Sequence, residues 1–514
     1  MKRIIPLSLV LCLFNVVNAP ARQLRANEFA PSAQHSESAP SLAELTASEA
    51  LDLIERGELT SEEYVAALLE RADSLSGLNV FISRDAAAAL AAAREADRRR
   101  ALGLPCGRLC GLPLIVKDNI NSAALPTTGG TPALVSNRPT TNAVVLQRLL
   151  DEGAILLGKS NMHELAFGAT SNNAFFGAVR NPYDVSRIPG GSSGGTAAAV
   201  AARIVPAGLG TDTAGSVRVP AALTGTVGFR PSAGRYSTDG LILISQTQDR
   251  AGTHARTVRD LVLLDRVLSE VGSRVRPLPL RRMRLGVDRA NFVANVDPEL
   301  IALFDKALDE LRGRGVEVVE VSVMPRADFL ATINALRFSI GFYEAPANLA
   351  NYLQGTTQPL ALAQLAAQVA SPDVRQIFFA FLVPGAPLAV TPQAYQAGLA
   401  ARARLRSAYQ SVMTENELDA LVFPTTPLAA SPIGQEIVRD PAGNFVPATL
   451  AYTQNVVPAS YAGLAGLSLP LGLTSAGLPV GLELDGLEGS DEKVLGVGLS
   501  IEKVLRRLPP PPLP

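Results

Sequence analysis

The chain has 514 residues, of which 47% are hydrophobic and 18% are charged, so it can bury a large core and is not disordered. Its 46 basic and 47 acidic residues nearly cancel and form no long run of either sign, which argues against a nucleic-acid-binding protein. The composition favours a globular enzyme whose partner is a small uncharged molecule, with no nucleic acid.

The N-terminus has the pattern of a cleaved secretory signal. Two basic residues precede an apolar run at 4–17, and a small-residue site follows at 19–21. The run has 14 residues, whereas a membrane-spanning helix needs about 20. We therefore predict a signal peptide at 1–21, a polar segment at 22–40, and a secreted or periplasmic protein without a stable membrane anchor.

Helices are expected to begin the mature chain. Apolar residues at helical spacing predict two helices between residues 41 and 75, separated by Gly57. Thr60 and Glu63 have the spacing of a capping box, which would open the second helix. An alanine-rich helix is expected at about 85–100.

Cys106 and Cys110 are the two cysteines that follow the predicted signal peptide. An exported protein can form disulfides, but their spacing alone does not decide between a bond and two free thiols. The whole chain contains three histidines, and none of them clusters with the cysteines. We therefore predict no metal site.

The next segments alternate between strand and helix. The apolar run LPLIVK predicts a buried strand that ends at Lys117. A helix at 143–153, a strand at 154–159, a helix at 196–203 and a strand at 204–212 are expected to follow. This alternation predicts an α/β fold with a large mixed, mostly parallel β-sheet core flanked by helices on both faces.

The second half of the chain continues with a strand-helix-strand unit, RLGV, PELIALFDKALDELRGRG and VEVVEVSV. Residues 328–414 are expected to be mainly helical, and LDALVFPTTP and GLPVGLELDG return to strands. The last residues, 509–514, form a proline-rich tail that is expected to be extended and peripheral.

Residues 153–160, GAILLGKS, satisfy the pattern of a phosphate-binding loop letter for letter. Such a loop needs a strand before its first glycine and flexible residues between its glycines. Here the four intervening residues are themselves strand-like, and amides paired in a sheet cannot bind phosphate. We therefore do not expect nucleotide binding.

The segment PGGSSGGT satisfies G-x-S-x-G with either Ser192 or Ser193 in the middle. A nucleophile elbow needs a strand that leads into it, which Pro189 disfavours, and then an acid and a histidine downstream. His254 is the one histidine downstream, so the pattern does not favour an α/β-hydrolase. His163 precedes both serines and is expected to be structural.

A lysine and two serines lie in runs rich in glycine and small residues. Lys117 ends the predicted strand, Ser192 lies in PGGSSGGT, and Ser216 lies 24 residues further on in GLGTDTAGSVRVPAALTG. Because histidine is so rare in this chain, a hydrolase would have to activate its serine with another base. A lysine can act as that base when it is neutral, a form that burial favours.

These segments resemble the amidase signature family, whose glycine- and serine-rich stretch corresponds to PGGSSGGTAAAVAARIVPAGLGTDTAGSVRVPAALTGTVGFRPSAG. The resemblance extends from LTASEALDLIERGELTSEEY through VKDNI and GKSNMHELAFG to GLPVGLELDG. It therefore implies the amidase signature fold, with one amidase domain at residues 41–508.

The resemblance also implies roles for single residues. Ser216 corresponds to the nucleophile, Ser192 to a bridging serine and Lys117 to the base. In this family the peptide before the bridging serine, here Gly191-Ser192, is cis. The oxyanion hole would consist of the backbone amides of Thr213, Ala214, Gly215 and Ser216. Ala214 stands where many members have glycine, so it suits this role only with a negative φ. No metal or organic cofactor is required.

The implied function is that of an exported amidase, which would hydrolyse a small carboxamide to a carboxylate and ammonia or an amine through a serine acyl-enzyme. Residues 228–265 resemble the branch that acts on arylacetamides such as indoleacetamide and mandelamide. The helical region at 328–414 would supply either pocket residues or plain core packing. The alternatives are a glutaminase-type amidotransferase subunit, an esterase or aryl acylamidase on the same fold, and a non-hydrolytic binding protein. A homodimer is left open.

Overall fold

The structure of this protein is a computed structural model that describes residues 41–269 and 272–513. The predicted signal peptide at 1–21 and the polar segment at 22–40 lie outside the described residues. Within the described ranges, none of the helices combines the length and the apolar character that crossing a membrane requires.

Three helices begin the described chain, as the sequence predicts. They are α1 (Ala47–Glu55), α2 (Ser61–Ser74) and α3 (Ala86–Ala101). Thr60 and Glu63 form the predicted capping box, in which each side chain bonds the backbone N–H of the other residue. This reciprocal pair satisfies two donors that the start of α2 would otherwise leave unpaired.

The loop between α3 and β2 contains a disulfide between Cys106 and Cys110, whose Cα atoms are 5.3 Å apart. The structure thus decides in favour of the bond at a position where the sequence left both forms open.

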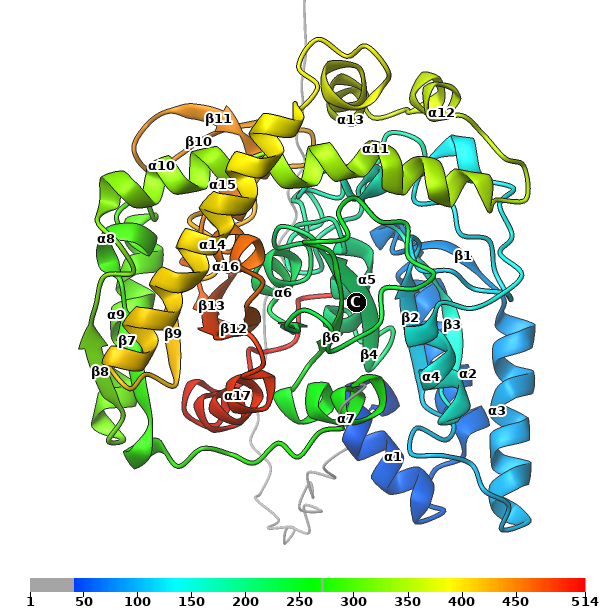
Figure 1. The fold of residues 1–514 in the computed structure, drawn as a ribbon. Helices are drawn as coiled ribbons and strands as arrows, with labels where there is room; N and C mark the ends of the chain where they lie inside the picture. The colour runs from blue at the N-terminus through cyan, green and yellow to red at the C-terminus, as the bar shows by residue number, and fades with distance from the viewer. Residues whose placement is uncertain (1–40, 270–271, 514) are drawn as a thin grey trace, which may run out of the picture. The chain divides into compact units, whose positions relative to one another are not determined.

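An 11-stranded mixed sheet forms the centre of the described fold (Figure 1). In spatial order its strands are β1 (Phe81–Arg84), β3 (Ile155–Ser160), β2 (Pro113–Lys117), β4 (Ala207–Asp212), β6 (Arg250–Ala255), β5 (Val227–Arg230), β12 (Ala465–Leu473), β13 (Pro479–Gly486), β9 (Ala420–Pro424), β7 (Arg284–Val287) and β8 (Glu317–Glu320). A separate small sheet pairs β10 (Ile437–Arg439) with β11 (Phe445–Pro447).

The mixed sheet with flanking helices is confirmed, but its parallel share is smaller than expected. Four neighbouring pairs are parallel, namely β3–β2, β2–β4, β9–β7 and β7–β8. The other six pairs of this described sheet are antiparallel. A turn closed from the N–H of Gly477 to the carbonyl of Thr474 joins β12 to β13, and a hairpin of this kind forces antiparallel pairing. The alternation of strand and helix does not show which strands become neighbours.

The remaining α-helices do not all contact the sheet, since the three between residues 339 and 377 pack with loop residues in a separate cluster. The remaining α-helices are α4 (Val144–Asp151), α5 (Gly194–Ala201), α6 (Arg218–Thr224), α7 (Val258–Leu268), α8 (Arg289–Phe292), α9 (Pro298–Gly313), α10 (Arg326–Leu336), α11 (Ser339–Gln354), α12 (Leu362–Gln368), α13 (Pro372–Ile377), α14 (Pro392–Glu415), α15 (Ala448–Thr453), α16 (Val457–Ala462) and α17 (Asp491–Leu505). Figure 1 shows α11, α12 and α13 grouped at the top of the view.

Strand β2 shows why both faces are covered. Its side chains alternate, as they must along a strand. Leu114 and Val116 join the core cluster that includes residues of α1, α4 and α7, while Ile115 joins the cluster with residues of α2, α3 and α5. Each face of this central strand therefore packs against its own layer of helices.

The proline-rich tail has no helix or strand in its described part, as expected, but it is anchored to the domain. The Tyr183 hydroxyl donates a hydrogen bond to the carbonyl of Pro509 at 2.7 Å. Leu513 packs against the core cluster that contains residues of α2, α3 and α5. Composition alone does not reveal these attachments, because they depend on surfaces far away in the sequence.

Candidate active site

Lys117 is the last residue of β2 and lies on the face of the sheet that α5 covers. Its side chain points to the same side as that of Ile115, because the two residues are separated by one position along the strand. Lys117 is fully buried, and its Nζ donates hydrogen bonds to Ser192 Oγ at 2.6 Å and to Thr211 Oγ1 at 2.8 Å. The structure therefore brings the predicted base and the predicted bridging serine into contact.

The surroundings of Lys117 favour a neutral amine. Burial lowers the pKa of its side chain from 10.5 to about 7, although the carboxylates of Asp212 and Asp249 oppose this change. The hydroxyl groups of Ser192 and Thr211 hold the nitrogen without adding a charge. Near pH 7 a large fraction of Lys117 is consequently able to accept a proton.

The loop before α5 places Ser192. The Gly191-Ser192 peptide is cis, as the family resemblance implies. Gly191 also has a steric role, since a Cβ at this position would lie 2.8 Å from the backbone nitrogen of Thr170. The neighbouring Ser193 is directed elsewhere, because its Oγ donates to the carbonyl of Thr211 at 3.1 Å. Of the two adjacent serines, Ser192 is therefore the one that contacts Lys117.

Ser216 lies in the loop that joins β4 to α6. The carbonyl of Ser216 accepts a hydrogen bond from the N–H of Ser193 at 3.2 Å, which ties this loop to the one before α5. Gly215 has a φ of 110°, and a Cβ there would meet Val456 Cγ2 at 2.4 Å. Among the described residues, no hydrogen bond links the hydroxyl groups of Ser192 and Ser216. The two loops are thus adjacent, while the contact between their hydroxyls is not formed.

The backbone amides around Ser216 divide into two groups. The N–H of Gly215 donates to Asp212 Oδ1 at 2.8 Å, so the expectation that it is free to bind an oxyanion is corrected. The N–H groups of Thr213, Ala214 and Ser216 have no acceptor within the described residues, and these three residues line a cavity. Ala214 does not have a positive φ, so its side chain causes no backbone strain at this position.

A buried charge network holds this loop in place. Asp212, at the end of β4, accepts hydrogen bonds from Arg218 Nε at 3.1 Å and from the N–H of Val217 at 3.2 Å. Arg218 also donates to Glu483 Oε1 at 3.0 Å. Burial alone would raise the pKa of Asp212, but the guanidinium charges of Arg218 and Arg230 outweigh it and keep the pKa well below its usual range. The carboxylate therefore stays ionised and orients the segment before Ser216.

Sequence reasoning missed this network and the hydroxyl of Thr211. Asp212 and Arg218 flank Ser216 in the same glycine-rich stretch, which is the one signal that could have indicated them. Glu483 lies 265 residues from its partner Arg218, so no local pattern points to it.

Ser216 opens into a cavity of about 240 Å³. Aromatic side chains from three separate parts of the chain line it, namely Phe167, Phe329, Phe338, Phe342 and Tyr461. Residues from the helical region at 328–414 therefore supply part of the pocket, as one of the two hypotheses for this region held. Other residues of the same region, such as Leu349 and Leu353, are buried core.

The lysine and the histidines that the two alternative motifs would use are buried, and two of them are bound to other side chains. Lys159 lies in β3, where its Nζ forms a buried ion pair with Asp118 at 3.0 Å. His163 Nε2 bonds to Asp373 Oδ2 at 2.9 Å, which fits the structural role expected for it. His254 is buried and has no hydrogen-bond partner within the described residues. These surroundings favour neither a phosphate loop nor a nucleophile elbow.

The chain belongs to the amidase family, whose model matches residues 63–495. The protein is an amidase that acts on amide C–N bonds.

Its relatives include an indoleacetamide hydrolase of Agrobacterium vitis, with 40% identity over 459 residues, which cover 88% of this chain and 96% of that protein. A mandelamide hydrolase of Pseudomonas putida is 40% identical over 485 residues, which cover 91% of this chain and 93% of that protein. The structure of native peptide amidase from Stenotrophomonas maltophilia aligns with a TM-score of 0.76 and 32% identity, over 92% of this chain and 99% of that chain. The predicted family, fold and branch are confirmed.

Proposed function

We propose that this amidase hydrolyses a small carboxamide through an acyl-enzyme on Ser216, with Ser192 as the bridging residue and Lys117 as the base. The observation that carries the proposal is the 2.6 Å contact between Lys117 Nζ and Ser192 Oγ. It is formed by a buried lysine with a pKa of about 7, next to the loop that presents Ser216 to the cavity.

In the first step Ser216 Oγ attacks the amide carbonyl carbon. Its proton passes to Ser192 Oγ, which gives its own proton to the neutral Lys117 amine. Ser192 and Ser216 are not hydrogen-bonded in this structure, and we expect rotation of a serine side chain to form that bond when substrate binds. The free amides of Thr213, Ala214 and Ser216 would stabilise the oxyanion, and one such donor is typically worth about 2.7 to 4 kcal/mol.

Collapse of the tetrahedral intermediate breaks the C–N bond. The proton held by Lys117 returns through Ser192 to the leaving nitrogen, so ammonia or an amine departs and the acyl group remains on Ser216 Oγ. Water then attacks the ester, and the same relay accepts a proton from this water and restores the Ser216 hydroxyl. The products are a carboxylate and ammonia or an amine, and the sequence of steps consumes one water without a cofactor.

The cavity favours a substrate with an aromatic acyl group. Phe167 and Phe342 form a tilted pair with ring centroids 6.1 Å apart, and both line the cavity beside Ser216. An aryl ring could pack against these faces and edges at little polar cost. The names of the two relatives point the same way, so we propose arylacetamides as the substrate class.

Replacement of Phe342 by alanine tests this class. We expect kcat/KM for phenylacetamide to fall about 10- to 100-fold, since the ring would lose apolar contact in the pocket. The small substrate acetamide should be hydrolysed at nearly the same rate as by the unchanged protein. Released ammonia measures both reactions.

Phe445→Ala is the matched control, because Phe445 is 78% exposed and does not line the cavity. It should leave both substrates unaffected. An equal loss for phenylacetamide and acetamide in Phe342→Ala would show that the ring supports the fold rather than the acyl group. A panel of aryl, alkyl and peptide amides, with the matching esters, then separates the aryl class from an esterase.

Export is proposed from the signal sequence at 1–21. Expression of the full chain in a Gram-negative host should yield a mature protein in the periplasm or medium, beginning at about residue 22. N-terminal sequencing measures this directly. Retention in the cytosol with an intact N-terminus would contradict export and favour the amidotransferase-type alternative, which works there with partner subunits. A homodimer stays a prediction that sedimentation analysis of the mature protein can test.

A further inference from the structure

A second cavity, of about 190 Å³, lies near the start of β4, at the other end of the central strands from Lys117. Strand β4 runs from Ala207 to Asp212, and Asp212 leads into the loop of Ser216. Ala207 pairs with Ala255 at the other end of β4, and Arg256, which lines the second cavity, follows directly. At about 3.3 Å per residue, the length of β4 alone separates the two sites by roughly 16 Å.

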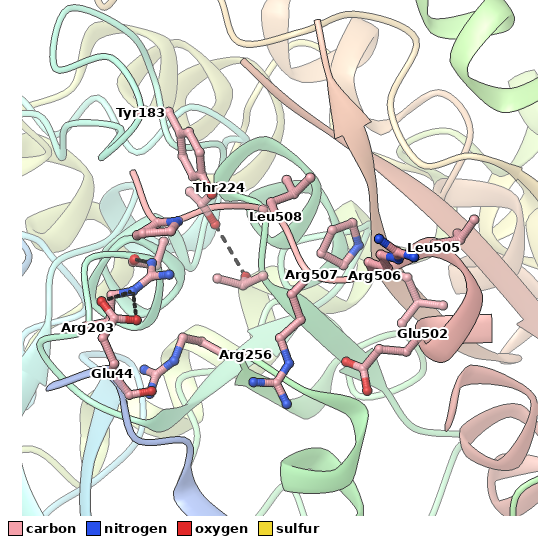
Figure 2. A pocket seen from close by; sticks show the side chains of 16 residues that line it. Glu44, Tyr183, Arg203, Thr224, Arg256, Glu502, Leu505, Arg506, Arg507 and Leu508 are labelled. Atoms are coloured by element: carbon pink, nitrogen blue, oxygen red, sulfur yellow. Dashed lines mark hydrogen bonds and ion pairs between the residues drawn. The ribbon is translucent and has the colours of Figure 1, made fainter. Parts of the chain in front are cut away.

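Arginine dominates the lining of this cavity (Figure 2). Four guanidinium groups, from Arg203, Arg256, Arg506 and Arg507, face two carboxyl groups, from Glu44 and Glu502. The hydroxyl groups of Tyr183, Thr224 and Thr226 complete the polar lining. Positive charge therefore exceeds negative charge in a partly enclosed space, which attracts anions.

Two of these arginines are fixed by the body of the domain. Arg203 Nε donates to both carboxylate oxygens of Glu44 at 3.1 Å. Arg256 donates to the backbone carbonyls of Leu45 and Val205. These bonds use the carboxylate of Glu44 for Arg203. Among the described residues Arg256 forms no ion pair, although the carboxylates of Asp260 and Glu44 act on it electrostatically.

Arg507 is one of two unpaired cations of the cavity among the described residues, and the other is Arg506. Within the described residues, the guanidinium of Arg507 forms no hydrogen bond or ion pair, and in Figure 2 it extends into the space between Arg256 and Glu502. Glu502 compensates this charge only partly, because burial raises the pKa of its carboxyl to about 7. Its Oε1 is also occupied by the N–H of Val258 at 2.9 Å.

The backbone that carries Arg507 into the cavity is strained. Arg506 ends α17 with a φ of 62° and a ψ of 161°, a region that residues other than glycine rarely occupy. Such a conformation costs about 1–3 kcal/mol and persists where the surroundings enforce it, often at ligand-binding positions. The turn directs the chain across the cavity, toward Leu508 and the bond between Tyr183 and Pro509.

We propose that this cavity binds a small oxyanion with two or more negative charges, such as inorganic phosphate or a di- or tricarboxylate. Arg507 would close on the anion from the C-terminal tail, and Arg203 and Arg256 would hold it from the domain. Guanidinium groups suit such ligands, because their N–H donors match pairs of oxygen atoms. The bound anion would tie the tail to the domain and stabilise the folded protein.

Thermal unfolding of the full mature chain at pH 7 tests the site. Phosphate and citrate are each compared with sodium chloride at the same ionic strength. We expect at least one of the two anions to raise Tm by about 3 °C at roughly one hundred times its Kd. The comparison shows whether the cavity prefers phosphate or a carboxylate anion. Calorimetric titration with the same two anions gives the affinities.

Arg507→Gln is the decisive variant, because its side chain is exposed and forms no hydrogen bond or ion pair within the described residues. We expect it to bind the preferred anion at least about tenfold more weakly and to lose the Tm shift. Arg314→Gln, an exposed arginine at the end of α9, should keep both. Amidase activity should be unchanged in the two variants, so the outcome is independent of the proposed reaction. An equal Tm shift in Arg507→Gln and Arg314→Gln, or no shift beyond that of chloride, would overturn the proposal.

Discussion

Replacement of Ser216 by alanine is expected to lower kcat about 10⁴- to 10⁶-fold, because the acyl-enzyme can no longer form. The residual rate would come from binding and from the free amides of the loop, which the substitution leaves in place. Ammonia release from phenylacetamide measures the loss. A fluorophosphonate probe should label the peptide that contains Ser216 in the unchanged protein and leave the variant unlabelled.

Ser193→Ala is the informative comparison, since Ser193 occupies the middle of one register of G-x-S-x-G. Its Oγ bonds a backbone carbonyl, so we expect a loss of less than about tenfold. Near-complete inactivation of Ser193→Ala together with an active Ser216→Ala would contradict the assignment and restore the hypothesis of a nucleophile elbow.

Replacement of Lys117 by methionine should lower kcat/KM about 10³- to 10⁴-fold while the fold is kept. Methionine has a similar shape and fills the buried space, but it cannot accept the proton of Ser192. Far-UV circular dichroism checks the fold. Lys306→Met, an exposed lysine on α9, should retain full activity, and a comparable loss in this control would show that the effect is not specific to the site.

The pH profile of the unchanged protein follows from the same lysine. Burial lowers the pKa of Lys117 to about 7, and the base works in its neutral form, which predominates above that pH. We therefore expect kcat/KM to rise with pH through about 7 and then to level off. Below pH 6 it should fall about tenfold per pH unit, as the neutral fraction does.

Asp249→Asn assigns this titration. Asp249 has a buried carboxyl, and burial raises its pKa to about 6. Titration of Asp249 could therefore also cause the fall of kcat/KM at low pH, the acidic limb of the profile. Its negative charge also raises the pKa of Lys117. If Lys117 is the base, the limb should persist in Asp249→Asn and move to lower pH. Disappearance of the limb would assign it to Asp249 instead.

Local sequence patterns pointed to the segments that the fold brings together at the candidate site, for a physical reason. Lys117 closes a short apolar run with β-branched residues that favours a buried strand, and the side-chain alternation of that strand sets the direction of the lysine. Ser192 and Ser216 lie in glycine-rich loops because neighbouring chain segments approach too closely for a Cβ at Gly191 and Gly215. These requirements act within a few residues and leave a visible trace in the sequence.

Other parts of the site depend on the path of a loop or on partners far away in the sequence. The Gly215 amide bonds Asp212 instead of facing the cavity, which only the path of the loop determines. The aromatic lining combines Phe167, Phe342 and Tyr461, residues separated by long stretches of chain. No periodicity connects them, so the sequence left open whether the region at 328–414 forms a pocket or core.

By itself, the sequence determined the α/β class and the helices and strands around the candidate site, because these depend on local hydrophobic periodicity and glycine placement. It also singled out Lys117, Ser192 and Ser216, whose roles the family resemblance implies and which stay a prediction. The tertiary structure alone decided which strands are neighbours, which amides stay free beside Ser216, and where the arginines near the C-terminus converge. These features depend on loop paths and on contacts between segments that are separated in the sequence, and the burial that lowers the pKa of Lys117 exists only once those segments have packed together.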